Sequence, residues 1–161
     1  MAEKRPERLT HVDDDGAARM VDVAAKDVTV RTATASGRVL VTDDVVDALR
    51  DDTIPKGDVL AVARIAGIQG AKRTSDLVPL CHPLALHGVT VDVSVTDDAV
   101  AITATVRTAD RTGVEMEALT AVSAAALTVV DMVKALDRSA VITDVRVDEK
   151  TGGRSGTWQR P

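Results

Sequence analysis

With 161 residues, the chain is long enough for one domain with its own core and short for two. Its formal net charge is −5 and Trp158 is its one aromatic residue, which argues against general nucleic-acid binding, because such proteins use basic surfaces and stacking aromatic side chains. The single cysteine, Cys81, excludes an internal disulfide, and the lack of both a signal peptide and an apolar run of roughly 20 residues predicts a cytoplasmic protein without membrane contact.

The N-terminal part is charged and polar. Residues 1–9 carry several charges and Pro6, so we predict a flexible leader over 1–9, a single domain over 10–156 and a short tail over 157–161. His11 precedes three consecutive aspartates, 13–15, a composition that would suit a metal ion. Consecutive side chains point in different directions in any regular structure, so a capped turn or a solvated loop is favoured, and we predict no metal site.

A strand and a short helix come next. Residues 28–36 alternate with a period of two and are rich in β-branched side chains, which predicts a strand ending at Gly37 that residues 39–41 can extend. Arg31 lies within this strand, where it either faces solvent or contacts a ligand. Thr42 is typical of an N-cap and two aspartates follow it, so we predict a helix to Arg50.

The segment 56–83 concentrates charged and reactive side chains. Apolar residues recur three and four positions apart from 57 to 72, which predicts a helix. An ammonium group at the start of this helix, that of Lys56, opposes the helix dipole unless an anion binds there. Pro79 and Pro83 then hold Cys81 and His82 on a stiff, irregular loop. Such a loop beside a basic helix is typical of a site for a small anionic ligand.

The remaining elements complete the fold prediction. Residues 88–96 and 100–108 alternate cleanly around Asp97 and Asp98, which predicts a β-hairpin. Helical spacing over 112–137 predicts a long helix, and residues 141–147 a last strand. This order predicts an α+β sandwich, with a mainly antiparallel sheet and helices packed on one face.

Glu117, Asp131 and Lys134 form one polar stripe on the long helix. The two carboxylates are fourteen positions apart, or about 21 Å along the axis, too far for one nucleotide-sized ligand in a single protomer. In one interpretation, each site takes one end of the helix from each of two subunits, with cations of one protomer facing acidic groups of its neighbour. In the other, Asp131 and Lys134 form an exposed ion pair without a functional role.

Four segments together resemble the cyclic pyranopterin monophosphate synthase family of molybdenum-cofactor biosynthesis: LTHVDDDGAARMVDV, KGDVLAVARIAGIQGAKRTSDLVPLCHPL, TGVEMEALTAVSAAALTVVDMVKALD and KTGGRSG. The resemblance covers residues 9–156. It implies a ferredoxin-like catalytic protomer and a homo-hexamer built from three dimers, with each site at a dimer interface. The implied activity is that of a lyase, which converts 3',8-cyclo-7,8-dihydro-GTP, the product of a radical enzyme, to cyclic pyranopterin monophosphate and pyrophosphate. No protein-bound cofactor is expected, and the presence of Mg²⁺ with the triphosphate is left open.

Matching motifs imply roles for individual residues. The implied catalytic residues are Asp131 and Lys134 as an acid/base couple, Lys56 as a phosphate-binding or proton-transfer lysine, and His82. The implied substrate contacts are Leu80, Cys81, His82, Glu115, Met116, Glu117, Arg31, Lys72 and Arg73. We expect Cys81 to bind substrate without a covalent bond, because the implied reaction needs no covalent step.

Two positions differ from the residue that is common in the family. Gly70 stands where alanine is frequent, and because glycine within a helix costs up to about 1 kcal/mol, we expect it to mark close packing. Arg154 stands where lysine is common; arginine can bind phosphate but is a poor proton donor.

A non-catalytic purine-nucleotide-binding oligomer is the alternative interpretation. The enzyme is favoured, because a protein that only binds a nucleotide has no need of an acid/base pair, and the chain combines Lys56, His82, Glu117, Asp131 and Lys134.

Overall fold

The computed structural model describes residues 11–13 and 15–161, so the predicted leader lies outside the described residues. One antiparallel sheet has the strand order β2-β3-β1-β4-β5. Its strands are β1 (Thr29–Leu40), β2 (Leu86–Val95), β3 (Ala99–Asp110), β4 (Val141–Thr151) and β5 (Trp158–Gln159). The helices are α1 (Asp43–Arg50), α2 (Val59–Lys72), α3 (Thr74–Leu77) and α4 (Glu115–Val133).

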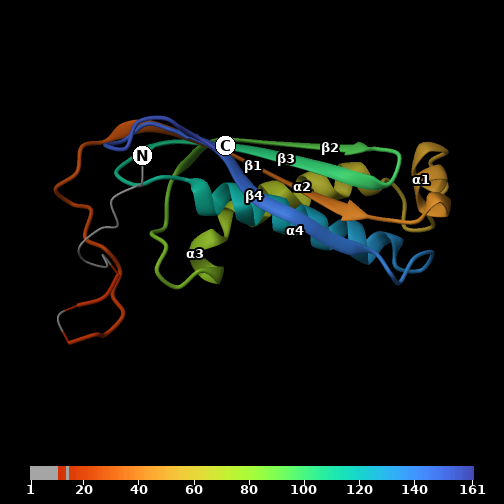
Figure 1. Cartoon of the computed structure of the whole chain (residues 1–161), viewed down its shortest axis with the longest axis horizontal. Helices are drawn as coiled ribbons and strands as arrows, with labels where there is room; N and C mark the ends of the chain where they lie inside the picture. Colours follow the sequence, from red (N-terminus) through yellow and green to blue (C-terminus); the bar gives the residue numbers. More distant parts are fainter. Residues whose placement is uncertain (1–10, 14) are drawn as a thin grey trace.

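The two long helices, α2 and α4, lie side by side on one face of the sheet, which confirms the predicted α+β sandwich of ferredoxin-like type (Figure 1). The alternation in β1 explains this layering. Ala33, Ala35 and Val39 are buried beneath the helices, whereas the residues between them point to the other face. A period-two pattern with one buried face is therefore what sets the side on which the helices pack.

Small side chains let the two helices approach closely in this core without phenylalanine or tyrosine. A Cβ atom added at Gly70 of α2 would lie 2.6 Å from the Cβ of Ala124 on α4 and 3.0 Å from the carbonyl oxygen of Thr120. The predicted close packing at Gly70 is thus confirmed. Because the core lacks large side chains, the close approach of α2 and α4 supplies its van der Waals contacts.

Several boundaries differ from the predicted ones. The second helix starts at Val59, because Asp58 acts as its N-cap and accepts a hydrogen bond from Ala61 N at 2.9 Å. Thr42 occupies the N-cap position of α1, but its side chain makes no capping hydrogen bond. The long helix spans α4 and is shorter at both ends than the predicted 112–137.

Two short elements escaped prediction. Helix α3 is a single turn within the segment expected to be irregular, and β5 lies in the predicted tail. β4 also continues to Thr151, well beyond the predicted end, and pairs with β5 through Glu149 and Lys150. A single helical turn and a two-residue strand are too short to leave a clear period in the sequence.

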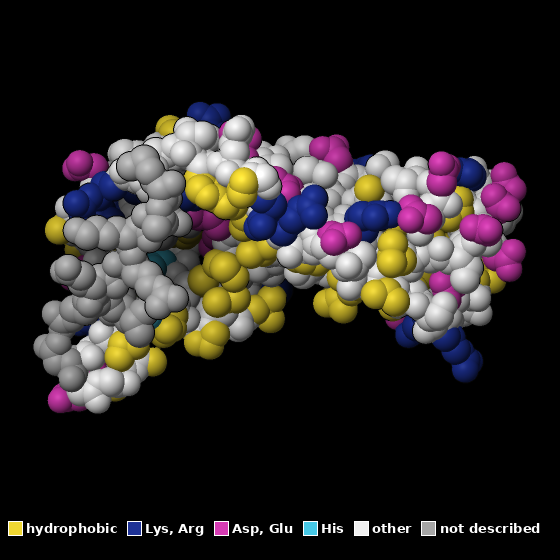
Figure 2. All heavy atoms as spheres, viewed as in Figure 1, with side chains coloured by type: hydrophobic (Ala, Val, Ile, Leu, Met, Phe, Trp, Pro, Cys, Tyr) yellow, Lys and Arg dark blue, Asp and Glu magenta, His cyan; other side chains and the backbone are white. Residues whose placement is uncertain are grey.

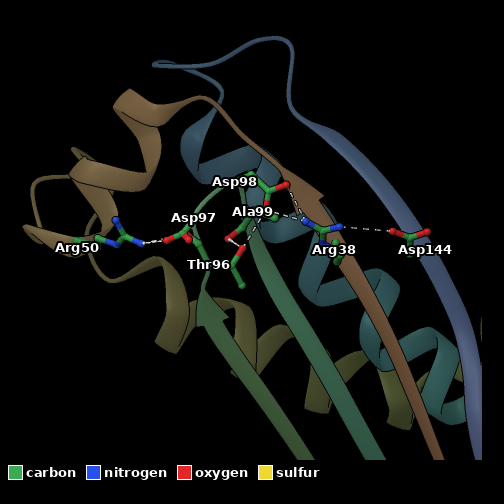
Figure 3. Close-up of polar contacts among 7 residues, drawn as sticks. All are labelled: Arg38, Arg50, Thr96, Asp97, Asp98, Ala99 and Asp144. Atoms are coloured by element: carbon green, nitrogen blue, oxygen red, sulfur yellow. Dashed lines mark hydrogen bonds and ion pairs between the residues drawn. The ribbon is translucent and has the colours of Figure 1, made fainter.

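The turn between β2 and β3 is the predicted pair Asp97 and Asp98, held by arginines from two other elements (Figure 3). Arg50 of α1 donates to Asp97 Oδ1 at 3.0 Å, and Arg38 of β1 donates to Asp98 Oδ1 at 2.7 Å. All four side chains are substantially exposed, so each ion pair contributes little to stability.

Helix α4 has 19 residues and a mean hydropathy of 1.6, so by length and composition it could cross a membrane. This differs from the expectation that no apolar segment would be long enough. Its apolar character has another explanation in this fold. The helix packs against α2 and the sheet, and residues such as Ala121, Val122 and Val129 are fully buried there. Such burial is typical of a core helix.

Candidate functional site

A lysine–aspartate–lysine cluster lies at the C-terminal end of α4. Lys56 Nζ, from the loop before α2, donates to Asp131 Oδ2 at 2.8 Å and to the Asp131 carbonyl oxygen at 2.9 Å. Lys134 Nζ lies 2.7 Å from the other carboxylate oxygen, Oδ1. Two residues separated by 75 positions in the chain, Lys56 and Asp131, are therefore in direct contact.

The two lysines control the charge of this carboxylate. Hydrogen bonding from Lys134 and then from Lys56 lowers the pKa of Asp131 to about 2. At neutral pH Asp131 is thus a carboxylate between two cations, so it can accept a proton or orient an ammonium group but holds no proton to donate. All three side chains are roughly half exposed, which leaves them open to a ligand.

A second polar group surrounds a cavity of about 400 Å³ at the other end of α4. The loop after α3 contributes Leu80, Cys81 and His82, and the first turn of α4 contributes Glu115, Met116 and Glu117. His11 and Lys26 from the N-terminal segment line the opposite wall. Six predicted substrate contacts therefore meet in one cavity.

Glu117 is the buried acid of this cavity. Its side chain is only 4% exposed, and burial raises its pKa to about 7, with the nearby Glu115 carboxylate adding to the effect. A carboxyl group with this pKa exchanges a proton near neutral pH, and in its protonated form it can donate a hydrogen bond.

Cys81 has the opposite character to a catalytic thiol. Burial, and then the charge of Glu117, raise its pKa above the ordinary value. Less thiolate is present at neutral pH as a result, and nucleophilic attack by this cysteine is disfavoured.

The loop that carries Leu80, Cys81 and His82 is shaped by its own sequence. Thr74 Oγ1 donates to Ala71 O at 2.9 Å where α2 passes into α3, and the backbone N–H of Cys81 donates to Val78 O at 3.0 Å. Pro79 and Pro83 flank the triplet and keep it out of regular structure. This irregular loop places the Cys81 thiol and the His82 imidazole in the lining of the cavity.

A cationic cavity of about 440 Å³ lies next to the first one, between β1 and the glycine-rich turn after β4. Three cations, Lys26, Arg31 and Arg154, line it, together with one carboxylate, Asp27, and Gly153. Gly153 has a φ of +74°, and a Cβ atom there would collide with the Arg31 guanidinium. Glycine at this position lets the turn close over the arginine.

Prediction from sequence missed two lysines near these cavities. Lys26 lines both of them, and Lys150 Nζ lies 3.3 Å from Glu115 Oε1 and donates to Ser155 Oγ at 2.8 Å. Lys26 stands alone in an irregular segment, and Lys150 lies beyond the predicted end of the last strand at residue 147. The one available signal was that Lys150 begins the KTGGRSG segment that resembles the family, whereas Lys26 lies outside all four such segments.

Two predicted contacts stay apart from the rest. Lys72 and Arg73 are exposed where α2 ends, and neither lines a cavity described above. The Asp131 cluster and the Glu117 cavity also remain separate, about 21 Å apart along α4.

Cations and acidic groups are mixed within one chain at both ends of α4. Lys56 contacts Asp131 within one chain, and Lys26 shares a cavity with Glu117. Each half of the site is therefore itself a mixture of cations and acids.

The chain is similar to known proteins over nearly its whole length. The chain is 74% identical over 154 residues to the cyclic pyranopterin monophosphate synthase of Streptomyces coelicolor, covering 96% of this chain and 91% of the relative. It is 70% identical over 159 residues to the protein of that name from Nocardioides sp., covering 97% and 98%. Cyclic pyranopterin monophosphate synthase 3 of Mycobacterium tuberculosis is 60% identical over 153 residues, covering 94% and 86%. The family model described as MoaC matches residues 20–153, and the chain belongs to the MoaC family.

Proposed function

We propose that this chain is a cyclic pyranopterin monophosphate synthase, a lyase of molybdenum-cofactor biosynthesis. Its substrate is the cyclised GTP derivative 3',8-cyclo-7,8-dihydro-GTP, and its products are cyclic pyranopterin monophosphate and pyrophosphate. The observation that carries the proposal is the contact of Lys56 and Lys134 with the two oxygens of Asp131, in a chain that closely matches relatives of this name.

The chemistry of the cluster fits a rearrangement that needs proton transfer. Asp131 stays ionised because its pKa is about 2, so the protons available at this end of α4 are those of Lys56 and Lys134. In this proposal, the carboxylate orients the two ammonium groups, one lysine donates a proton to the substrate, and the neutral amine that remains accepts one in return. Their cationic charge also stabilises negative charge that develops on the phosphate.

The other residues bind the two ends of the substrate. The cavity around Glu117 holds the purine-derived rings, where the buried carboxyl group and His82 supply hydrogen bonds. Lys26, Arg31 and Arg154 offer the charge that a triphosphate requires. Lys72 and Arg73 belong to this site only if another subunit lies against the end of α2.

Assembly is part of the proposal, because one ligand cannot span the two halves in a single protomer. Two chains related by a twofold axis would place the Asp131 cluster of one beside the Glu117 cavity of the other, and three such dimers form the hexamer. The helical layer offers apolar surface for contact: Val62 and Ile65 of α2 are 43% and 60% exposed, and Leu127 of α4 is 63% exposed. Figure 2 shows hydrophobic side chains gathered along the lower rim of the molecule, near α3 and α4.

An assay of pyrophosphate release tests the proposal directly. Purified protein mixed with the cyclised GTP derivative is expected to release one pyrophosphate per molecule of substrate and to form cyclic pyranopterin monophosphate, identified by mass spectrometry. Tight binding of the substrate without pyrophosphate release would instead identify the non-catalytic nucleotide-binding oligomer. Repeating the assay with EDTA measures whether Mg²⁺ is needed with the triphosphate.

A functional link to the radical enzyme that supplies the substrate also belongs to this proposal, as does the cytoplasmic location. A coupled reaction with that enzyme and GTP is expected to give the same product as the isolated intermediate.

A further inference from the structure

We infer that Arg111 is a positioning residue, which holds Lys26 at the junction of the two cavities and is not itself in contact with substrate. The inference rests on the proposed function for the nature of the ligand, a triphosphate, and on the geometry of the Lys26 turn for the role of Arg111.

Among residues 11–13 and 15–161, Lys26 is the one cation shared by the Glu117 cavity and the cationic cavity. It lies in an irregular segment that precedes β1, in a turn closed by a hydrogen bond from Lys26 N to Val23 O at 3.0 Å. A lysine on such a turn has no helix or strand to fix its backbone. Something outside the segment must therefore hold it if its ammonium group is to serve both cavities.

Arg111 supplies that support from the end of β3. Its Nε donates to the carbonyl oxygen of Lys26 at 3.0 Å in a partly buried contact. Among the described residues, this is the one hydrogen bond that joins residues 15–28 to a residue later in the chain. The removal of Arg111 would thus free the turn while leaving every helix and strand intact.

The preceding residue, Asp110, anchors Arg31, one of the two arginines that line the cationic cavity. Arg31 Nε donates to the Asp110 carbonyl oxygen at 2.9 Å, and Asp110 Oδ1 accepts a hydrogen bond from Arg111 N at 2.7 Å. Two consecutive residues thus hold Lys26 and Arg31 at a fixed separation. Such preorganisation reduces the cost of ordering cationic side chains around a phosphate chain.

Arg111 itself faces elsewhere. It lines a neighbouring cavity together with Asp110, His82 and the segment 20–24, and it does not line either cavity that Lys26 lines. Its guanidinium therefore acts on the ligand through the backbone of Lys26. This separates its role from that of the cations that would touch phosphate.

A double-mutant cycle with inorganic triphosphate as the probe tests the inference. Arg111→Gln in the intact chain is expected to weaken triphosphate binding, measured by calorimetry, by about 3- to 10-fold, the effect of one lost hydrogen bond that preorganises a site. In a Lys26→Ala background the same change is expected to alter affinity less than about twofold, because the side chain that it positions is gone. Arg107→Gln, on an exposed arginine of β3, controls for the loss of one positive charge.

Arg111→Lys adds a second readout. Lysine keeps the charge and a donor, so Arg111→Lys is expected to recover part of the triphosphate affinity. In Arg111→Gln, KM for the cyclised GTP derivative is expected to rise, with kcat changed less than twofold. Equal losses from Arg111→Gln with and without Lys26 would overturn the positioning role, as would a loss matched by Arg107→Gln.

The outcomes also separate this inference from the proposed function. A defect in triphosphate binding in a protein that releases no pyrophosphate would support Arg111 as a positioning residue and refute the synthase. Normal turnover with unchanged KM and triphosphate affinity in Arg111→Gln would refute Arg111 as a positioning residue and support the synthase. A wild-type protein that releases pyrophosphate but does not bind inorganic triphosphate would refute the positioning role and leave the synthase in place.

Discussion

Lys56 Nζ lies 2.8 Å from Asp131 Oδ2 and 2.9 Å from the carbonyl oxygen of the same residue. The second contact joins the lysine to the C-terminal turn of α4, where free carbonyl groups attract a cation. Lys56 is thereby fixed by two acceptors of one residue. Its position before α2, unfavourable for that helix alone, is offset by the end of α4.

Replacing either member of this pair should abolish turnover. We expect Lys56→Ala and Asp131→Ala each to lower kcat for pyrophosphate release at least about 100-fold, the contribution typical of a positioned acid/base group. Both side chains are about half exposed, so folding and assembly should be unchanged by circular dichroism and light scattering. Asp47→Asn, an exposed change on α1, is the control, and an active Lys56→Ala or Asp131→Ala variant would contradict the proposed roles.

The pKa of Asp131 should report both lysines. Lys134→Met is expected to raise it further above its value of about 2 than Lys56→Met does, because the hydrogen bond from Lys134 is the larger cause of the lowering. Stabilisation from a lowered carboxyl pKa is present above the ordinary aspartate value of about 4 and is lost as the pH falls toward 2. NMR titration of the labelled carboxyl carbon measures the change, and an Asp131 pKa that ignores both substitutions would rule out the cluster in solution.

Glu117 should make stability depend on pH in the opposite sense. Its pKa is raised to about 7, so between about pH 4.5 and 7 the folded chain holds a proton that the unfolded chain releases, and stability falls as the pH rises. Relative to the wild type, Glu117→Gln should therefore gain stability from pH 5 to pH 8, on the order of 2–3 kcal/mol for such a shift. Urea unfolding at fixed protein concentration checks this, and a stability difference that does not vary with pH would show that Glu117 ionises normally.

Close packing of the two long helices should be sensitive to one methyl group. Gly70→Ala is expected to cost about 1–3 kcal/mol of unfolding free energy, because the new Cβ would lie 2.6 Å from that of Ala124. Gly88→Ala is a matched control, since its Cβ would meet Arg107 Cβ at 3.9 Å, an ordinary contact. Equal stability of the two variants in urea would show that α2 and α4 separate at little cost.

Mixed assemblies should reveal a site shared between subunits. Asp131→Ala and His82→Ala are each expected to be inactive, yet a random mixture of the two should recover about one quarter of wild-type activity, because half of the dimers then contain one intact site of two. Subunit exchange is confirmed by co-purification of two tags. Mixtures that exchange subunits and stay inactive would show that each site is built from one chain.

Helical and strand periodicity determined most of the fold before any contact was known. Alternation in residues 28–36 placed β1, two aspartates marked the β2–β3 turn, and recurring apolar residues located α2 and α4. These are local signals, because a side chain's direction repeats with the backbone geometry. Boundaries were less accurate where a distant partner decides them: Asp137, which the predicted helix included, instead accepts hydrogen bonds from Ser139 and from Thr42 beyond the end of α4.

Motif chemistry likewise singled out Lys56, His82, Glu117 and Asp131 from the sequence alone, while their grouping came only from the tertiary structure. The sequence separates Lys56 from Asp131 by 75 positions, and only packing of α2 against α4 brings them together. Packing also raises the pKa of Glu117, assigns Lys26 to two cavities and leaves Lys72 and Arg73 outside them. Residue type sets what a group can do; distance and burial, which depend on the whole chain, set what it does at a given pH.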